Sequence, residues 1–226
     1  MCDKKGLTLI EILVAMSILA LLIMILFSVF DISLRGWKKA NNLLEVNSIA
    51  RIVLERMERE ISSAIVKSDG SIYCLGVDGP SGWRTDSKAD EFYFIAPLNP
   101  GETQKSDLCE VGYWLDGNSA AAVSDDVLRR FYVTDGRRTG SPASFDFDFS
   151  TPSGKANSNE LAAYVTDLQF VYYDQNNNQQ TSWDSRTDGG LPSKIKITIT
   201  VEAGKGSSST NPDYVSRDFS TIISFR

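Results

Sequence analysis

An apolar stretch near the start of the chain constrains its fold more than any other feature. From Leu7 to Phe30 the only polar side chains are those of Thr8, Glu11, Ser17 and Ser28. These 24 residues, as a helix rising about 1.5 Å per residue, span roughly 36 Å, enough to cross a hydrocarbon core of about 30 Å. No Gly or Pro interrupts the run before Gly36. The stretch therefore predicts a membrane-spanning helix.

One side chain in this stretch is unusual for a membrane segment. Glu11 lies in the first turns of the predicted helix, and the next acidic residue is Asp31. A charge at the centre of a bilayer costs on the order of 2.5–3.5 kcal/mol on insertion scales, and less near the interface. Acidic residues within membrane segments usually have a partner and a functional role. Glu11 is therefore a candidate functional residue.

The residues around this acid form a motif that reads Lys4-Lys5-Gly6-Leu7-Thr8-Leu9-Ile10-Glu11. It resembles the class III signal of type IV pilins and of the related pseudopilins, which usually have Phe where this chain has Leu7. The resemblance implies that a membrane peptidase cuts between Gly6 and Leu7 and methylates the new N-terminus at Leu7. A freed α-amino group titrates near pH 8 and is mostly cationic at neutral pH. We therefore expect Glu11 to act in assembly, by meeting the Leu7 ammonium of a neighbouring subunit.

The alternative for this segment is an ordinary signal anchor in which Glu11 has no special role. An ordinary secretory signal has a shorter apolar core followed by a small-x-small cleavage site. No such site follows Phe30, where residues 31–37 continue a helical pattern.

Composition limits the chemistry that the chain can perform. The net charge is −6 and there is no His. The absence of His removes Ser-His-Asp and Cys-His catalytic arrangements and the commonest metal ligand. No basic stripe suggests nucleic acid as a partner. We expect no catalytic residues, no cofactor and no metal site.

The cysteines suggest one covalent link. Cys2 lies in the predicted leader, which leaves Cys74 and Cys109 as a pair in an exported region. Disulfides form in oxidising compartments, so we predict a disulfide between Cys74 and Cys109. The alternative is two buried thiols.

The helical pattern continues beyond the membrane segment. Apolar residues recur at intervals of three and four at Val46, Ile49, Ala50, Val53, Met57, Ile61, Ala64 and Ile65. This spacing places them on one side of a helix, which we expect to pack on a sheet. The other side carries Arg51, Glu55, Arg56, Glu58, Arg59 and Glu60. We expect Arg51 to pair with Glu55, Glu55 with Arg59, and Arg56 with Glu60. Gly36 and the pair Asn41-Asn42 are places where the helix could bend.

After residue 70 the pattern changes to short runs that alternate with period two. The predicted strands are 72–77, 91–96, 110–115, 128–134, 145–149, 167–173, 194–201 and 219–225. The predicted loops include 78–90, 151–159, 175–190 and 204–213. Strands without interleaved helices predict an α+β fold, in which one long N-terminal helix packs on an antiparallel β-sheet. Aromatic residues on these strands are expected to lie in the core.

One loop resembles a calcium site only in part. Asp174-Gln175-Asn176-Asn177-Asn178 begins like such a loop. Gln179 then stands where the Gly of a sharp turn is needed, and Ser185 where a bidentate Glu is needed. We expect a polar hairpin loop here.

The C-terminal part narrows the resemblance. The segment Tyr164–Asp174, then Trp183, then Leu191–Ile199 is similar to the tail of the J-type minor pseudopilins of type II secretion. W-type minor pilins of type IV pili resemble it too. Both imply a pilin-like subunit with other minor subunits as partners.

These observations predict a cleaved leader (1–6), a transmembrane half-helix (7–30), an amphipathic half-helix (31–67) and an exported β-rich domain (70–226). We expect a minor pseudopilin, a structural subunit at or near the tip of a periplasmic pseudopilus, anchored in the inner membrane and processed by the prepilin peptidase. The alternatives are a minor pilin of a type IV pilus, and a membrane-anchored periplasmic enzyme or ligand-binding domain.

Overall fold

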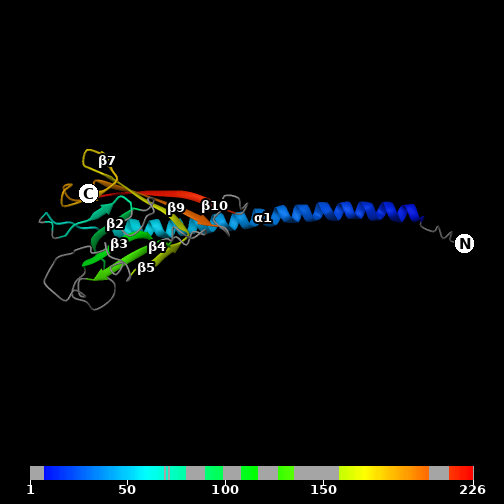
Figure 1. The fold of residues 1–226 in the computed structure, drawn as a ribbon, viewed down its shortest axis with the longest axis horizontal. Coiled ribbons are helices and arrows are strands. Elements are labelled where there is room, and N and C mark those ends of the chain that lie inside the picture. Colours follow the sequence, from blue (N-terminus) through cyan, green and yellow to red (C-terminus); the bar gives the residue numbers. More distant parts are fainter. Residues whose placement is uncertain are drawn as a thin grey trace.

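A single long helix, α1, carries a β-rich domain at its C-terminal end (Figure 1). The computed structural model describes residues 8–68, 70, 72–79, 90–98, 108–116, 127–134, 158–203 and 214–225. Helix α1 spans Leu9–Ile61, 53 residues, which corresponds to about 80 Å. Thr8 caps its N-terminus and Ser62 its C-terminus. The predicted continuity across Gly36 is confirmed, although the helix ends at Ile61, earlier than the predicted boundary at residue 67.

The domain is built from antiparallel strands in two sheets. The strands are β1 (Leu75–Val77), β2 (Glu91–Pro97), β3 (Leu108–Asp116), β4 (Val127–Thr134), β5 (Asn159–Ala163), β6 (Val165–Tyr173), β7 (Gln179–Gln180), β8 (Trp183–Asp184), β9 (Lys194–Ala203) and β10 (Val215–Ser224). The first sheet, sheet A, has the order β5-β4-β3-β2-β1-β8, and the second, sheet B, has the order β10-β9-β6-β7. The predicted α+β class is confirmed.

The sequence located the longer strands and missed the shorter ones. Strand β9 follows the predicted alternation, with Ile195, Ile197 and Ile199 fully buried between partly exposed polar residues. Strands β7 and β8 lie in the segment 175–190 that was predicted as a loop. Strand β5 was not predicted, and only its first residue lies in a predicted loop. Runs of two to five residues give no readable period. Strand β10 begins at Val215, four residues before the predicted start at Phe219. The predicted strand 145–149 lies outside the described residues.

The core lies between α1 and the inner faces of both sheets. The helix contributes a continuous buried stripe, which consists of Val46, Ala50, Val53, Met57 and Ile61. Stacked and tilted aromatic rings line the facing sheet surface, with ring centroids of Phe92 and Phe170 5.5 Å apart and those of Tyr172 and Trp183 6.3 Å apart. The expected burial of Phe94, Phe170 and Tyr172 in this core is confirmed. Tyr93 and Trp114 are also buried, but they pack with Phe131 in a separate cluster. Tyr132 and Tyr173, which were also expected in the core, are only partly buried. Most of the stabilisation of the domain therefore comes from burying this apolar surface.

The backbone of β1 at Gly76 lies close to the side chain of Tyr172 on β6. A Cβ atom added at Gly76 would lie 2.1 Å from the hydroxyl oxygen of Tyr172. Only glycine leaves room for this approach, which lets β1 of sheet A lie against β6 of sheet B.

A buried carboxylate also links the two sheets. Asp90 immediately precedes β2, and its backbone N–H donates to the carbonyl of Leu168 on β6 (2.9 Å). Its side chain accepts hydrogen bonds from the backbone N–H groups of Phe170 (2.7 Å) and Gly79 (3.1 Å). Burial raises the pKa of Asp90 to about 6, and the nearby charges of Asp78 and Asp167 also raise it. The contribution of Asp90 to the stability of the folded domain therefore depends on pH.

We predict that the contribution of Asp90 to the stability of the domain falls as the pH rises from about 4 to above about 6. The unfolded carboxyl ionises near pH 4, whereas the folded one keeps its proton to about pH 6, so ionisation favours the unfolded chain in this interval. Thermal unfolding of the full chain in detergent should show this dependence. Asp90→Asn should weaken it, and Asp218→Asn, which changes an exposed residue of β10, should keep it. An unaltered pH dependence in Asp90→Asn would contradict the assignment.

Candidate assembly surface on the long helix

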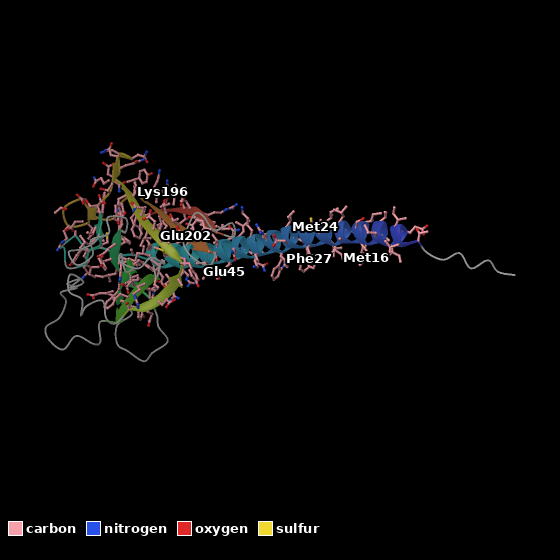
Figure 2. The ribbon with its side chains drawn as sticks, turned by 45° about the vertical axis from the view of Figure 1, so that its right-hand side comes forward. Met16, Met24, Phe27, Glu45, Lys196 and Glu202 are labelled. Atoms are coloured by element: carbon pink, nitrogen blue, oxygen red, sulfur yellow. The ribbon has the colours of Figure 1, made fainter. Side chains whose placement is uncertain are left out.

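The N-terminal half of α1 touches no part of the described domain. Every described residue from Thr8 to Asn41 is exposed, and the first partly buried positions are 42 and 43. Figure 2 shows Met16, Met24 and Phe27 projecting from this bare helix. By length and composition, α1 is the one described helix that can cross a membrane. An apolar surface of this size is stable only in contact with lipid or with other helices.

The N-terminal end of α1 holds the candidate acid in a specific geometry. The hydroxyl and the backbone N–H of Thr8 each donate to Oε2 of Glu11 at 2.8 Å. The backbone N–H of Glu11 donates in turn to the Thr8 hydroxyl (3.4 Å). This arrangement is a capping box. It gives the carboxylate a partner within its own chain, a partner that our sequence analysis missed although the Thr-x-x-Glu spacing signals it.

The predicted cleavage site lies next to this cap. Gly6 and Leu7 are outside the described residues, so processing at this bond stays a prediction.

At the other end of α1, a second acid is buried in the domain. Glu60 is 4% exposed. Its Oε2 accepts a hydrogen bond from Nε of Arg130 on β4 (2.8 Å) and another from the hydroxyl of Tyr113 on β3, and its Oε1 accepts one from Nε of Arg56 (3.1 Å). We call Glu60, Tyr113 and Arg130 the helix clamp.

Electrostatics favour the charged form of Glu60 in the helix clamp. Burial by itself raises the pKa of Glu60, but the hydrogen bonds from Arg130 and Tyr113 outweigh this effect, so that the pKa is lowered. The guanidinium of Arg130 also lies 4.6 Å from the centre of the Tyr132 ring. A charged, fully partnered Glu60 therefore ties α1 to the middle of sheet A.

The prediction that Glu60 lies on the solvated side of the helix is wrong. Glu60 lies seven positions after Val53, which places it in line with the buried stripe. This spacing could have indicated its burial. The predicted pairs of Arg56 with Glu60 and of Arg51 with Glu55 (2.7 Å) are confirmed.

The two cysteines are not joined, so the predicted disulfide is wrong. Both are buried thiols. Cys74 directly precedes β1, Cys109 lies on β3, and β2 runs between these strands. Strands two apart are about 9–10 Å from each other, whereas a disulfide needs Cα atoms within about 7 Å. The Cys109 thiol instead donates to the carbonyl of Leu98 (3.1 Å) and lies 3.2 Å from the hydroxyl of Tyr132.

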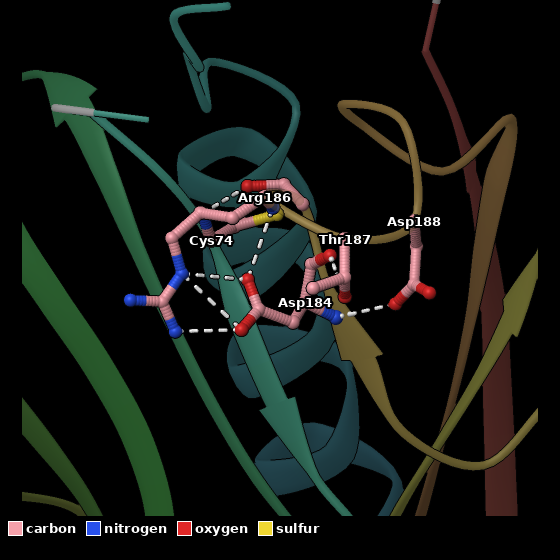
Figure 3. A network of polar contacts seen from close by, with 6 residues as sticks. Cys74, Asp184, Arg186, Thr187 and Asp188 are labelled. Atoms are coloured by element: carbon pink, nitrogen blue, oxygen red, sulfur yellow. Dashed lines mark hydrogen bonds and ion pairs between the residues drawn. The ribbon is translucent and has the colours of Figure 1, made fainter. Parts of the chain in front are cut away.

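Cys74 helps to seat a polar turn that follows β8 (Figure 3). Its backbone N–H donates to the hydroxyl of Ser185 (2.9 Å), and the N–H of Ser185 donates back to the carbonyl of Cys74 (3.1 Å). Within the turn, Arg186 pairs with Asp184 (2.6 Å). Burial raises the pKa of the Cys74 thiol to about 12, so the thiol is not activated as a nucleophile.

The loop after β6 is a hairpin, as predicted. Oδ1 of Asp174 accepts from the backbone N–H groups of Asn176 and Asn178, both at 2.8 Å, and Oδ2 accepts from the Asn178 side chain. Its oxygens are thus engaged by the chain itself. Among the described residues, no group of three acidic, Cys or His side chains could hold a metal ion.

Comparison with known families gives two matches. The model described as type II secretion system (T2SS), protein J matches residues 41–208. The model of the prokaryotic N-terminal methylation motif matches residues 1–27. No curated protein matches the chain.

We predict that breaking the helix clamp on one side is more harmful than removing it. Arg130→Met leaves Glu60 buried without its closest cation and should cost about 3 kcal/mol of unfolding free energy. The triple variant Glu60→Met/Tyr113→Phe/Arg130→Met should recover most of this loss, because it also removes the buried Tyr113 hydroxyl, which would otherwise lose its acceptor. Urea unfolding of the full chain in detergent measures both. Arg51→Met, in an exposed pair, should cost at most about 1 kcal/mol. Equal losses in Arg130→Met and in the triple variant would contradict the role of the clamp.

Proposed function

Because this chain belongs to the protein J family of the type II secretion system, whose members are minor pseudopilins, we propose that it takes its place at or near the tip of a periplasmic pseudopilus. One observation carries the proposal. The apolar half of α1 is bare, while the other half is fixed in the domain by a buried stripe and the helix clamp. Such a subunit can offer its helix to neighbours while its domain stays folded.

The family match favours secretion over the type IV pilus, and it favours a structural subunit over an enzyme. The apolar half of α1 suits an inner-membrane anchor. We propose that the domain faces the periplasm, where a subunit of the type II secretion pseudopilus would assemble. In this arrangement residues 1–6 are the leader, 7–30 cross the membrane, 31–67 form the amphipathic half and 70–226 form the exported domain.

In this proposal, the Glu11 carboxylate changes its partner during assembly, from Thr8 of its own chain to the Leu7 ammonium of a neighbouring subunit. Before assembly, the capping box with Thr8 satisfies the carboxylate. In the fibre, a Leu7 ammonium and a Glu11 carboxylate of adjacent subunits meet, which reduces the cost of two charges in a medium of low dielectric constant. The charge pair would then set the axial register between helices, which a uniformly apolar surface does not define. The partners are other minor pseudopilins and the prepilin peptidase.

The first test concerns processing. We expect the mature chain to begin at Leu7 with a methylated amino group, and Gly6→Leu to block cutting by placing a side chain at the cleavage site. Intact-mass analysis of protein from native membranes measures both. Gly36→Leu is the matched control, because an added Cβ at Gly36 meets no atom within 4 Å, and it should be processed normally. Retention of Met1 in cells with an active prepilin peptidase would contradict the proposal.

The second test concerns the charge of Glu11. Glu11→Leu and Glu11→Gln should leave insertion and cutting intact but reduce crosslinking to partner pseudopilins and secretion. Thr8→Val removes the hydroxyl of the capping box and keeps the charge, so it should assemble far better than either variant. If the carboxylate served only as a helix cap, Thr8→Val would fail and Glu11→Gln would assemble normally. Normal crosslinks and secretion in Glu11→Leu would show that the charge has no role in assembly.

A further inference from the structure

A short segment of α1 between the membrane half and the domain carries a distinct set of side chains. We call Arg35, Trp37, Lys38 and Lys39 the collar. All four residues are exposed, and Trp37 is 65% exposed. The collar lies in residues 28–40, which neither family model matches. It is therefore a feature of this chain that its family membership does not explain.

The collar follows the proposed membrane-crossing segment and lies within side-chain reach of the headgroup layer of a bilayer. A hydrocarbon core of about 30 Å takes up about 20 helical residues, which lie within that segment and end near Phe30. The Cα atoms of Trp37 and Lys39 then lie about 11–14 Å beyond the hydrocarbon edge. Side chains on a helix tilt toward its N-terminus, here toward the bilayer. Long Lys side chains and the Trp ring therefore reach the headgroups.

Charge at this level favours an anionic partner. Asp31 neutralises Arg35 through an ion pair of 2.7 Å. Lys38 and Lys39 make no ion pair with any residue that the structure describes. The described part of the domain supplies no ion-pair partner at this height, because the first partly buried positions of α1 are 42 and 43. Among the described residues, Lys38 and Lys39 are therefore available to an anionic partner outside the chain.

The collar residues do not all lie on one side of the helix, because the three cationic residues share an arc of about 100° and Trp37 lies outside it. At about 100° per residue, Arg35 and Lys39 lie on the side of the buried stripe, and Trp37 lies on nearly the opposite side. Lys38 falls between them. A partner helix contacts one side only, whereas lipid headgroups contact a helix from all directions. The distribution therefore favours lipid over a protein neighbour.

We propose that the collar binds anionic phospholipid headgroups of the membrane leaflet that faces the domain. The lysines contact the phosphate groups, and the Trp37 ring lies against the headgroups. The collar thereby fixes the height of the domain above the bilayer before the subunit is withdrawn into the fibre. This inference rests on the proposed membrane insertion of α1, but it requires no partner subunit.

The experiment reconstitutes the full chain in vesicles of phosphatidylcholine with a minority of phosphatidylglycerol. In one preparation the phosphatidylglycerol is brominated in its acyl chains near the headgroup. In the other preparation the phosphatidylglycerol is unlabelled and an equal number of phosphatidylcholine molecules are brominated at the same position. Bromine quenches nearby Trp fluorescence. The chain has four Trp residues, so the difference between wild type and Trp37→Phe isolates the signal of Trp37.

We expect stronger quenching of Trp37 by brominated phosphatidylglycerol. Each Lys near an anionic surface contributes about fivefold to the local preference, which corresponds to about 1 kcal/mol. Lys38→Gln/Lys39→Gln should abolish the difference between the two lipids. The matched control is Lys194→Gln/Lys196→Gln, which makes the same change in charge at the end of the domain far from the bare helix (Figure 2), and it should keep the preference. Added salt should reduce the preference by screening.

Three results would overturn the proposal. Absence of quenching by either lipid would place Trp37 in water or on a protein. Equal quenching by both lipids would show that the headgroup charge is not recognised. Loss of the preference in the Lys194/Lys196 control would show a general effect of charge. None of these readouts depends on secretion, so a failure here is distinct from a failure of the pseudopilin assignment, which the crosslinking and secretion assays test.

Discussion

The burial of Glu60 is the interaction on which the arrangement of the molecule depends. A carboxylate in an apolar interface is tolerated only when its oxygens are partnered, and here the partners come from both β3 and β4. This requirement fixes the rotation of α1 about its own axis as well as its position along sheet A. Because an α-helix is stiff, the rotation set at Glu60 also decides the direction in which each residue of the bare half points.

The remaining contacts hold the two sheets around this fixed helix. Asp90 joins the start of β2 to β6, and the paired hydrogen bonds of Cys74 and Ser185 join β1 to the turn after β8. The close approach at Gly76 lets the sheets come together over Tyr172. Sheet B contributes mainly apolar contacts to α1 through β9 and β10. The domain and the C-terminal half of α1 therefore form one folded unit, and a force applied along α1 would be transmitted to both sheets.

The surfaces to which we assign functions lie outside this unit, along the exposed half of α1. Three features follow one another along this half of the helix: Glu11, the apolar surface and the collar. In the proposed function, Glu11 meets a neighbouring subunit, the apolar surface meets the membrane interior and the collar meets the lipid headgroups. In the proposed function, the exposed half of α1 serves membrane insertion and contact with neighbouring subunits, and the other half attaches the helix to the domain.

The sequence alone determined the long helix, the membrane segment, the candidate acid Glu11 and the strand alternation of Lys194–Val201, because each of these rests on periodicity or composition within one segment. Tertiary structure decided the rest. Whether Glu60 is solvated or buried depends on Arg130, 70 residues away along the chain, and whether Cys74 can reach Cys109 depends on β2 lying between their strands. The short strand β5 exists because β4 offers it an edge. The periodic pattern of a segment indicates which of its sides is buried, but it does not identify the distant residues that this side contacts, and only the folded chain shows them.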